Sequence, residues 1–259
     1  TPPSQGGDHG FESRMRYQTV DGISSGFPRI RLLFIHLNII MKTESCPLCM
    51  TESPIFFYQS TRVNLVRDFL KCTNCQLVFV PSDFHLSLSQ QRDRYLEHNN
   101  DPMDSDYRSF LSRLRDPLLP LLKDGDVGLD FGCGPGPALA QMLRESGYKM
   151  DLYDPLFKDN ASALKGSYDF VTCTETVEHF SYPASDFALL DRVVKPEGVL
   201  GIMTSILYED VIFEDWYYKL DPTHVSFYTP VTMEWISNRF NWLIRGTHKN
   251  VYFFVKQGL

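Results

Sequence analysis

The sequence predicts an α/β fold: a doubly wound, mostly parallel sheet that ends in an antiparallel hairpin, preceded by a small cysteine-rich segment. Three observations support this. Strand-like apolar runs alternate with helical spacing from residue 127 onward, a glycine-rich turn joins the first of these strands to the first helix, and two C-x-x-C pairs precede them. With 259 residues, 43% of them hydrophobic, the chain suits one full α/β domain plus something small.

The amino-terminal segment, residues 1–41, is expected to be a disordered or non-native extension. It carries glycine, serine and scattered charge without a helical or strand period. Its apolar stretch, 32–40, follows two arginines as the core of a signal peptide does, but no small-residue cleavage site comes after it. Met41, just before the first cysteine pair, resembles a natural start.

The segment 42–82 is predicted to be a zinc ribbon. Two C-x-x-C pairs separated by 22 residues supply two thiolates each from a tight turn: Cys46 with Cys49, and Cys72 with Cys75. This spacing is typical of a tetrahedral four-cysteine zinc site, although disulfides or unrelated thiols are the alternative. Four thiolates leave no open coordination position, so the zinc is expected to be structural. A segment this short needs the metal for much of its stability.

The next segment, 83–122, shows leucines and aromatic residues at helical spacing. Pro102, Pro117 and Pro120 are expected to break it into pieces. It is predicted to be a helical linker that lies over the bound ligand as a lid, with aromatic side chains that serve mainly as core.

The stretch 127–136 (VGLDFGCGPG) joins an apolar strand to a glycine-rich turn that opens a helix. The glycines allow a tight turn and a close approach of backbone to a ligand at a helix N-terminus. A second acid, Asp154, ends the next strand-like segment 18 residues after Gly136, where a carboxylate can reach a ribose diol. The turn reads G-x-G-x-G instead of the dinucleotide pattern G-x-G-x-x-G, and Asp130 would repel a pyrophosphate.

The rest of the domain alternates strands and helices. Only 14 residues separate Asp154 from Asp169, too few for a full helix and strand, so one helix-strand unit should be stunted. The last two strands lie close together and predict a terminal antiparallel hairpin. The predicted strands are 127–131, 149–153, 169–174, 198–204, 240–246 and 250–255, and the predicted helices are 137–146 and 184–194.

The wording DFGCGPG resembles motif I of the class I S-adenosylmethionine-dependent methyltransferases, and the resemblance continues in the family's order over about residues 120–255. It implies a Rossmann-like sheet with a C-terminal antiparallel hairpin over 123–259 and S-adenosyl-L-methionine as cofactor. The cofactor-binding residues that it implies are Asp130, Gly132, Gly134, Gly136, Asp154, Thr174 and Glu175.

The segment 174–179 (TETVEH) follows the predicted strand 169–174, at the edge where ligands bind in such sheets. Its E-x-x-E-H pattern resembles the metal-binding motif of ubiquinone-pathway O-methyltransferases and of small-RNA terminal 2′-O-methyltransferases, which add a later histidine. Here Glu175, Glu178, His179 and His224 would bind Mg²⁺ or another divalent ion. Alternatively, His179 or His224 acts as a base without metal, or the residues are structural. The catalytic candidates are therefore His179, His224 and Glu175.

An aromatic-rich insert follows the predicted strand 198–204. It walls the acceptor pocket or simply packs, and the sequence leaves both readings open. Its members are Trp216, Tyr217, Tyr218, Phe227 and Tyr228.

The predicted function is methyl transfer from S-adenosylmethionine to an oxygen or carbon of a small-molecule or carrier-linked acceptor. The rivals are an RNA methyltransferase and a methyltransferase-like binding module with a ribbon for docking. A net charge of −7 and the absence of Lys/Arg blocks longer than two argue against a nucleic-acid partner. No apolar run reaches 18 residues, so no membrane span is expected, and the predicted location is cytoplasmic.

Overall fold

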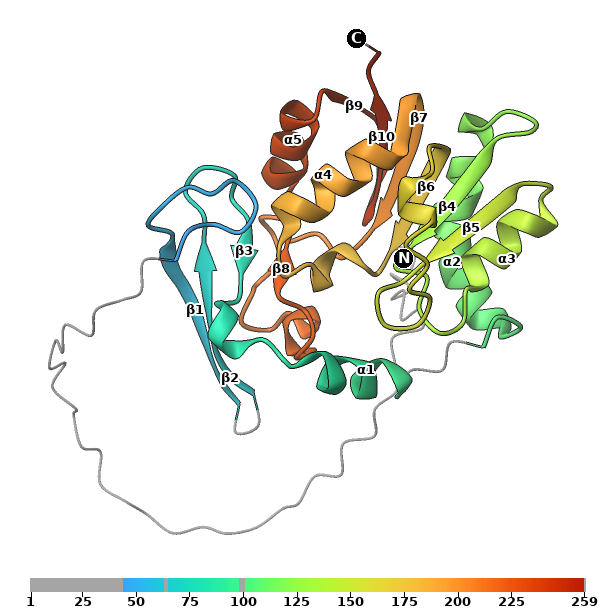
Figure 1. Ribbon diagram of the computed structural model, residues 1–259. Helices are drawn as coiled ribbons and strands as arrows, with labels where there is room; N and C mark the ends of the chain where they lie inside the picture. The colour runs from blue at the N-terminus through green and yellow to red at the C-terminus, as the bar shows by residue number, and fades with distance from the viewer. Residues whose placement is uncertain (1–43, 63–64, 98–100, 259) are drawn as a thin grey trace, which may run out of the picture.

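The computed structural model describes residues 44–62, 65–97 and 101–258. The predicted extension, 1–41, lies outside these residues. Within them the chain forms two sheets, a six-stranded one on the right of Figure 1 and a four-stranded one on the left.

The larger sheet has the order β5-β4-β6-β7-β10-β9. Its strands are parallel from β5 through β7, whereas β10 runs antiparallel to both of its neighbours. The predicted Rossmann-like α/β fold with a C-terminal antiparallel hairpin is therefore confirmed. The strands are β4 (Val127–Phe131), β5 (Lys149–Tyr153), β6 (Tyr168–Thr174), β7 (Val194–Met203), β9 (Trp242–His248) and β10 (Val251–Lys256).

Helices cover both faces of this sheet (Figure 1). Helices α4 (Pro183–Val193) and α5 (Pro230–Arg239) pack on one face, where β10 contributes Phe254 to the core. Helices α2 (Ser105–Leu118) and α3 (Ala138–Glu145) pack on the other, where β10 contributes Phe253. Adjacent residues of one strand thus serve opposite cores, as the twofold period of a strand requires.

Two sequence expectations about the helices had different outcomes. The unit between β5 and β6 is stunted as predicted, because it contains only the 3₁₀ turn Ala163–Lys165. Pro117, in contrast, does not break α2, so that prediction was wrong. It lies in the last turn of the helix, where the missing N–H costs one backbone hydrogen bond close to the point at which α2 ends. Leu114 and Leu118 of α2 are fully buried, which makes α2 a packed layer of the domain.

The smaller sheet has the order β1-β2-β3-β8 and joins distant parts of the chain. Strands β1 (Ile55–Arg62), β2 (Leu65–Lys71) and β3 (Val78–Phe79) come from the predicted ribbon. The fourth strand, β8 (Ser226–Phe227), comes from the C-terminal half and pairs antiparallel with β3. The pairing continues where Val80 N–H donates to the Val225 carbonyl at 2.9 Å.

An aromatic core holds this sheet against the segment 207–227. Phe69 and Phe227 are fully buried in it, and Phe213 packs edge-on against Phe69 with ring centroids 5.1 Å apart. Trp216 and Tyr218 of the aromatic insert belong to the same cluster. The insert therefore packs against the ribbon for most of its length, although Tyr217 is 46% exposed.

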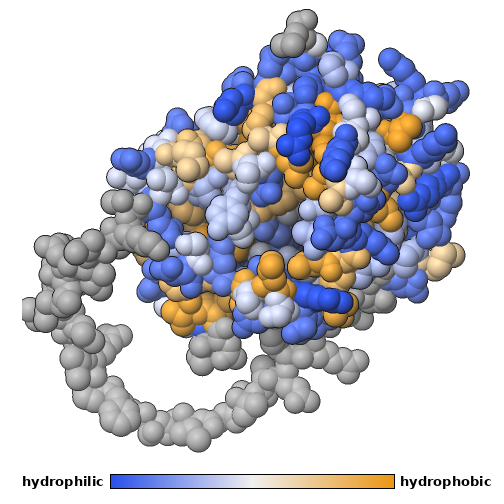
Figure 2. Space-filling model, viewed as in Figure 1, coloured by the Kyte–Doolittle hydropathy of each residue, from blue (hydrophilic) through white to orange (hydrophobic). Residues whose placement is uncertain are grey.

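The surface view in Figure 2 mixes hydrophilic and hydrophobic residues. The exposed apolar side chains include Ile55, Phe56 and Val66 of the β1–β2 hairpin. Of the helices that the structure describes, none combines the length and apolar character required to cross a membrane.

Gly128 in β4 lies in a tightly packed part of the larger sheet. A Cβ atom at this position would lie 2.3 Å from Phe170 Cζ and 2.6 Å from Met150 Sδ. Both neighbours belong to the core under α2 and α3, so neither can move freely. Glycine is therefore required here for space.

We expect Gly128→Ala to lower the free energy of unfolding by about 1–3 kcal/mol, because the added methyl group overpacks a tight core. Urea denaturation measures the change. Gly246→Ala is the matched control, since a Cβ there meets nothing within 4 Å. Equal stabilities of the two variants would show that the sheet can yield at Gly128.

Candidate functional site

The glycine turn after β4 is tied to the end of β5. Gly132 and Gly134 have φ angles of 77° and 62°, in the left-handed region that favours glycine. The N–H groups of Gly132 and Cys133 both donate to the Tyr153 carbonyl, at 2.8 and 3.2 Å. Two neighbouring strands therefore hold the turn in place, at the edge where parallel strands end and ligands bind.

The two sides of this turn differ. A Cβ at Gly132 would lie 2.2 Å from the Thr176 side chain, whereas a Cβ at Gly134 would meet nothing within 4 Å. Gly136 leads into α3, and its carbonyl accepts from Ala138 N–H at 2.8 Å. One side of the turn thus packs against protein while the other faces open space, as a ligand cradle requires.

Thr174, at the end of β6, offers a second sign of a ligand. Its Oγ1 is buried and has no hydrogen-bond partner among the described residues. Buried hydroxyls are normally paired, so an unpaired one at this edge fits a site that a polar ligand completes.

Asp154 is buried, and its carboxylate accepts hydrogen bonds from two turns, the glycine turn and the turn that follows β5. One carboxylate oxygen accepts from Gly134 N–H at 3.0 Å, and the other accepts from Leu156 and Phe157 N–H at 2.8 and 3.0 Å. A carboxylate has about four acceptor positions, so about one is left for a ribose hydroxyl. Asp154 therefore shapes the glycine turn besides any contact with a ligand.

Asp130 lies beneath the turn and is only 4% exposed. The Thr172 hydroxyl donates to its Oδ1 at 2.8 Å. Burial raises the pKa of Asp130 to about 6, and the hydrogen bond from Thr172 opposes that rise. The charge of Asp130 also acts on Tyr107 of α2. Burial, and then the charges of Asp130 and Glu175, raise the pKa of the Tyr107 phenol.

A second cluster lies beyond the end of β6. Glu178, His179 and His224 each offer one ligand atom, and these atoms lie within 4.8 Å of one another. The Nδ1 atoms of His179 and His224 face the carbonyls of Thr223 and Tyr218, at 3.1 and 2.8 Å. A carbonyl only accepts, so Nδ1 carries the proton in each ring. In the neutral form of each ring, Nε2 then has the lone pair that a metal-ligating histidine uses.

Glu178 is fully buried, and hydroxyl groups surround it. Thr204 donates to its Oε2 at 2.9 Å, and Tyr218 donates to its Oε1 at 2.5 Å. Its Oε1 also lies 3.9 Å from His179 Nε2. Burial, and then the charge of His179, lower the pKa of His224 to about 3, so this imidazole is neutral and weakly basic.

Glu175, the fourth predicted ligand, does not belong to the same cluster. It lies outside the cluster of Glu178, His179 and His224, although the Tyr218 hydroxyl reaches its Oε2 at 3.3 Å. Its φ angle is 48°, so no helical turn connects it to the 3₁₀ segment Val177–His179. The structure thus brings three of the four predicted residues together.

Helix α1 (Leu88–Leu96) adds contacts that the sequence analysis did not identify. The Tyr95 ring lies 5.0 Å from the His179 ring, and the Arg94 guanidinium binds Asp221 Oδ2 at 2.9 and 3.2 Å. Burial would raise the pKa of Asp221, but His224, Thr223 and Arg94 hold it well below its usual range. For the contact with Asp221, the sequence offered one signal, the turn-forming DPTH stretch 221–224.

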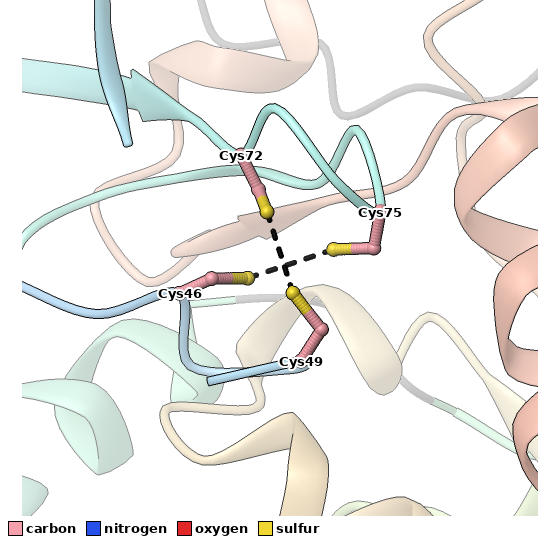
Figure 3. A group of neighbouring side chains, drawn as sticks. All are labelled: Cys46, Cys49, Cys72 and Cys75. Atoms are coloured by element: carbon pink, nitrogen blue, oxygen red, sulfur yellow. Dashed lines mark hydrogen bonds between the residues drawn. The ribbon is translucent and has the colours of Figure 1, made fainter. Parts of the chain in front are cut away.

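The four ribbon cysteines converge on one point (Figure 3). The Sγ atoms of Cys46 and Cys75 are 3.5 Å apart, and those of Cys49 and Cys72 are 3.4 Å apart. Zn–S bonds of about 2.3 Å place tetrahedral sulfurs roughly 3.8 Å apart, so the observed spacing fits zinc. All four thiols are free in this structure, and their sulfur separations of 3.4 and 3.5 Å exceed a disulfide bond of about 2.05 Å.

Charge also favours a metal among the cysteines. The hydrogen bond from Cys75 lowers the pKa of Cys46 to about 5, while the pKa of Cys75 is raised. Without a cation, ionised Cys46 therefore suppresses the ionisation of Cys75. A divalent ion would allow all four sulfurs to be deprotonated.

Comparison with known proteins identifies the domain. A model of the methyltransferase domain family matches residues 103–245. The ubiquinone biosynthesis O-methyltransferase of Sodalis glossinidius (strain morsitans) is 38% identical over 78 residues, which are 30% of this chain and 31% of the relative. That of Vibrio campbellii (strain ATCC BAA-1116) is 35% identical over 80 residues, 30% of this chain and 34% of the relative. The match therefore spans about a third of the length of these curated relatives.

Among solved structures, an O-methyltransferase family protein from Burkholderia thailandensis aligns at 17% identity with a TM-score of 0.41, over 65% of this chain and 63% of that chain. The family model covers more than half of the sequence and includes the glycine turn and strands β4 to β7. The chain therefore belongs to the methyltransferase domain family.

Proposed function

We propose that the protein transfers a methyl group from S-adenosylmethionine to a hydroxyl oxygen of a small-molecule or carrier-linked acceptor. The observation that carries the proposal is one shared sheet edge. The glycine turn, with its open side at Gly134, follows β4. Glu178 and His179 follow the neighbouring strand β6, and His224 joins them from the segment before β8. A cofactor in the turn would thus lie next to groups able to handle an acceptor oxygen.

Methyl transfer from a sulfonium is an in-line displacement at carbon, and the cofactor brings its own activation. The protein has to position the two reactants, exclude water and accept the hydroxyl proton. Asp154 and the turn would hold the cofactor, and Thr174 would donate to it or accept from it. Tyr95 and Tyr107, on α1 and α2, would cover the acceptor side.

For the cluster, we propose a divalent ion held by Glu178, His179 and His224. The carbonyl-bound Nδ1 atoms and the two hydroxyls on Glu178 orient the ligand atoms as outer partners do in known metal sites. Such an ion would orient the acceptor oxygen and lower its pKa. A base at His224 has less support, because a pKa of about 3 makes it a poor proton acceptor near neutral pH.

The names of the curated relatives support transfer to oxygen, since the first of them is a ubiquinone biosynthesis O-methyltransferase. The acidic balance of the chain, with a net charge of −7, favours a small or carrier-linked acceptor over RNA. For the four cysteines, we propose a structural zinc ion, because the sulfur positions fit a tetrahedron.

S-adenosylhomocysteine should bind with micromolar affinity, about 8 kcal/mol, as measured by calorimetry. Asp154→Ala should weaken this by roughly 1.5–3 kcal/mol, because charged hydrogen bonds around the turn are lost. Asp159→Ala, an exposed acid on the same loop, should leave the affinity unchanged. Equal affinities for both variants would remove Asp154 from the cofactor site.

Zinc-loaded protein should bind one Co²⁺ or Mn²⁺ ion at the cluster. Glu178→Gln and His224→Ala should weaken this binding by more than about 100-fold. The first removes the negative charge of the carboxylate, and the second removes an imidazole ligand. Glu175→Gln should keep it, since that carboxylate lies outside the cluster. An equal loss in Glu175→Gln would restore the four-residue set, and no binding at all would eliminate the ion.

Purified protein should carry about one zinc per chain, and Cys72→Ser should abolish it, because three thiolates hold the ion far less well than four. Atomic absorption measures the content. Cys133→Ser is the matched control, as this thiol lies in the glycine turn away from the ribbon cluster. A zinc-free wild type with an intact ribbon would contradict the structural role.

A further inference from the structure

Arg67 of β2 is a charged side chain that is almost completely enclosed, with 2% of its surface exposed. Its guanidinium reaches across from the ribbon into the loop 219–224 of the C-terminal half. There it donates four hydrogen bonds to backbone carbonyls, of Lys219 (2.6 Å), Asp221 (2.8 Å), Pro222 (3.2 Å) and His224 (3.0 Å).

Four carbonyls of one short loop therefore point at a single cation. Their dipoles repel one another when no positive charge stands between them, and burial strengthens that repulsion. Burial lowers the pKa of Arg67 only to about 10, so the guanidinium stays charged near neutral pH. Its planar fork of donors suits several acceptors at once, which a lysine ammonium does less well.

Two further carbonyls, of Thr223 in this loop and of Tyr218 just before it, face the histidines of the site. The Tyr218 carbonyl accepts from His224 Nδ1, and the Thr223 carbonyl accepts from His179 Nδ1. Six of the seven carbonyls of 218–224 thus divide between one arginine and the two imidazoles. Because they share a short backbone, the direction of one set fixes the direction of the other.

We propose that Arg67 is a positioning residue of the methyl-transfer site, which sets the tautomer and direction of His179 and His224 by holding the loop 219–224. The inference rests on the proposed function of these histidines. It makes the ribbon a part of the site, although no ribbon side chain belongs to the cluster of Glu178, His179 and His224.

A purely structural role explains Arg67 less well. The ribbon is already joined to this region by the β3–β8 pairing and by the aromatic core around Phe69 and Phe227. An apolar side chain stacked on Phe69 would avoid the desolvation of a buried cation, whose Nε has no partner among the described residues. The four bonds have their main effect on loop geometry.

Nitrogen NMR of the full-length, zinc-loaded protein with ¹⁵N-labelled histidine tests the proposal. In wild type, His179 and His224, assigned with His179→Gln and His224→Gln, should each show a single tautomer with the proton on Nδ1. Arg67→Met keeps the length and loses every donor, so both rings should move toward the averaged signals of exchanging tautomers. Arg67→Lys keeps the charge with fewer donors and should give a smaller displacement.

Leu70→Ala is the matched control, because Leu70 lies on the same strand but packs in a different core cluster from the stacked Arg67 and Phe69. It should lower stability without changing either tautomer. Zinc content and S-adenosylhomocysteine affinity, measured on each variant, show whether the fold and the cofactor site persist.

Single Nδ1–H tautomers in folded Arg67→Met, or a different tautomer in wild type, would overturn the proposal. If Arg67→Met does not fold, Arg67→Lys decides: unchanged tautomers in that variant overturn it and a partial shift supports it. A wild type that fails to bind S-adenosylhomocysteine would count against the proposed function instead, since the tautomers are measured without cofactor.

Discussion

The pairing of β3 with β8 is the contact on which the arrangement of the two sheets depends. It consists of two residue pairs, Val78 with Phe227 and Phe79 with Ser226. Val225 extends it in both directions, because its carbonyl accepts from Val80 and its N–H donates to the Glu178 carbonyl at 2.9 Å. One short stretch of backbone thus links the ribbon to the acid of the cluster. The fully buried rings of Phe69 and Phe227 keep water from competing for these bonds.

Most of the larger sheet could be predicted from the sequence because its signals are local. Strands β4 and β5 have their predicted bounds, since each is a short apolar run closed by an acid and a turn. The convergence of the four cysteines followed from their spacing alone. Strand β8 could not be predicted, because two residues carry no period and its partner lies about 150 positions away. The prediction for Pro117 was wrong because proline disrupts the interior of a helix, whereas Pro117 lies one residue before the end of α2.

The site shows the same division between local and distant information. Glu178 and His179 are neighbours in the sequence, and the families that the E-x-x-E-H pattern resembles add a later histidine, here His224, so these three could be named. The groups that orient them could not. Tyr218 and Thr204 act through hydroxyls that the fold brings to Glu178, and the Nδ1 partners of both histidines are backbone carbonyls, which every residue possesses. Glu175 was grouped with them by the E-x-x-E-H pattern, but its φ angle of 48° turns the chain away from a helix.

The distance along the chain between Arg67 and its carbonyl partners also determines the order of assembly. Lys219 follows Arg67 by 152 residues, whereas Cys46 and Cys75 are 29 residues apart. During synthesis on a ribosome, the four cysteines can therefore come together early. The edge of β3 that pairs with β8 stays unpaired until residue 227 emerges. Contacts of such high sequence separation form late and slow the folding of the whole chain. The loop 219–224 is thus completed late in folding, and a nascent chain that carries the entire glycine turn still lacks it.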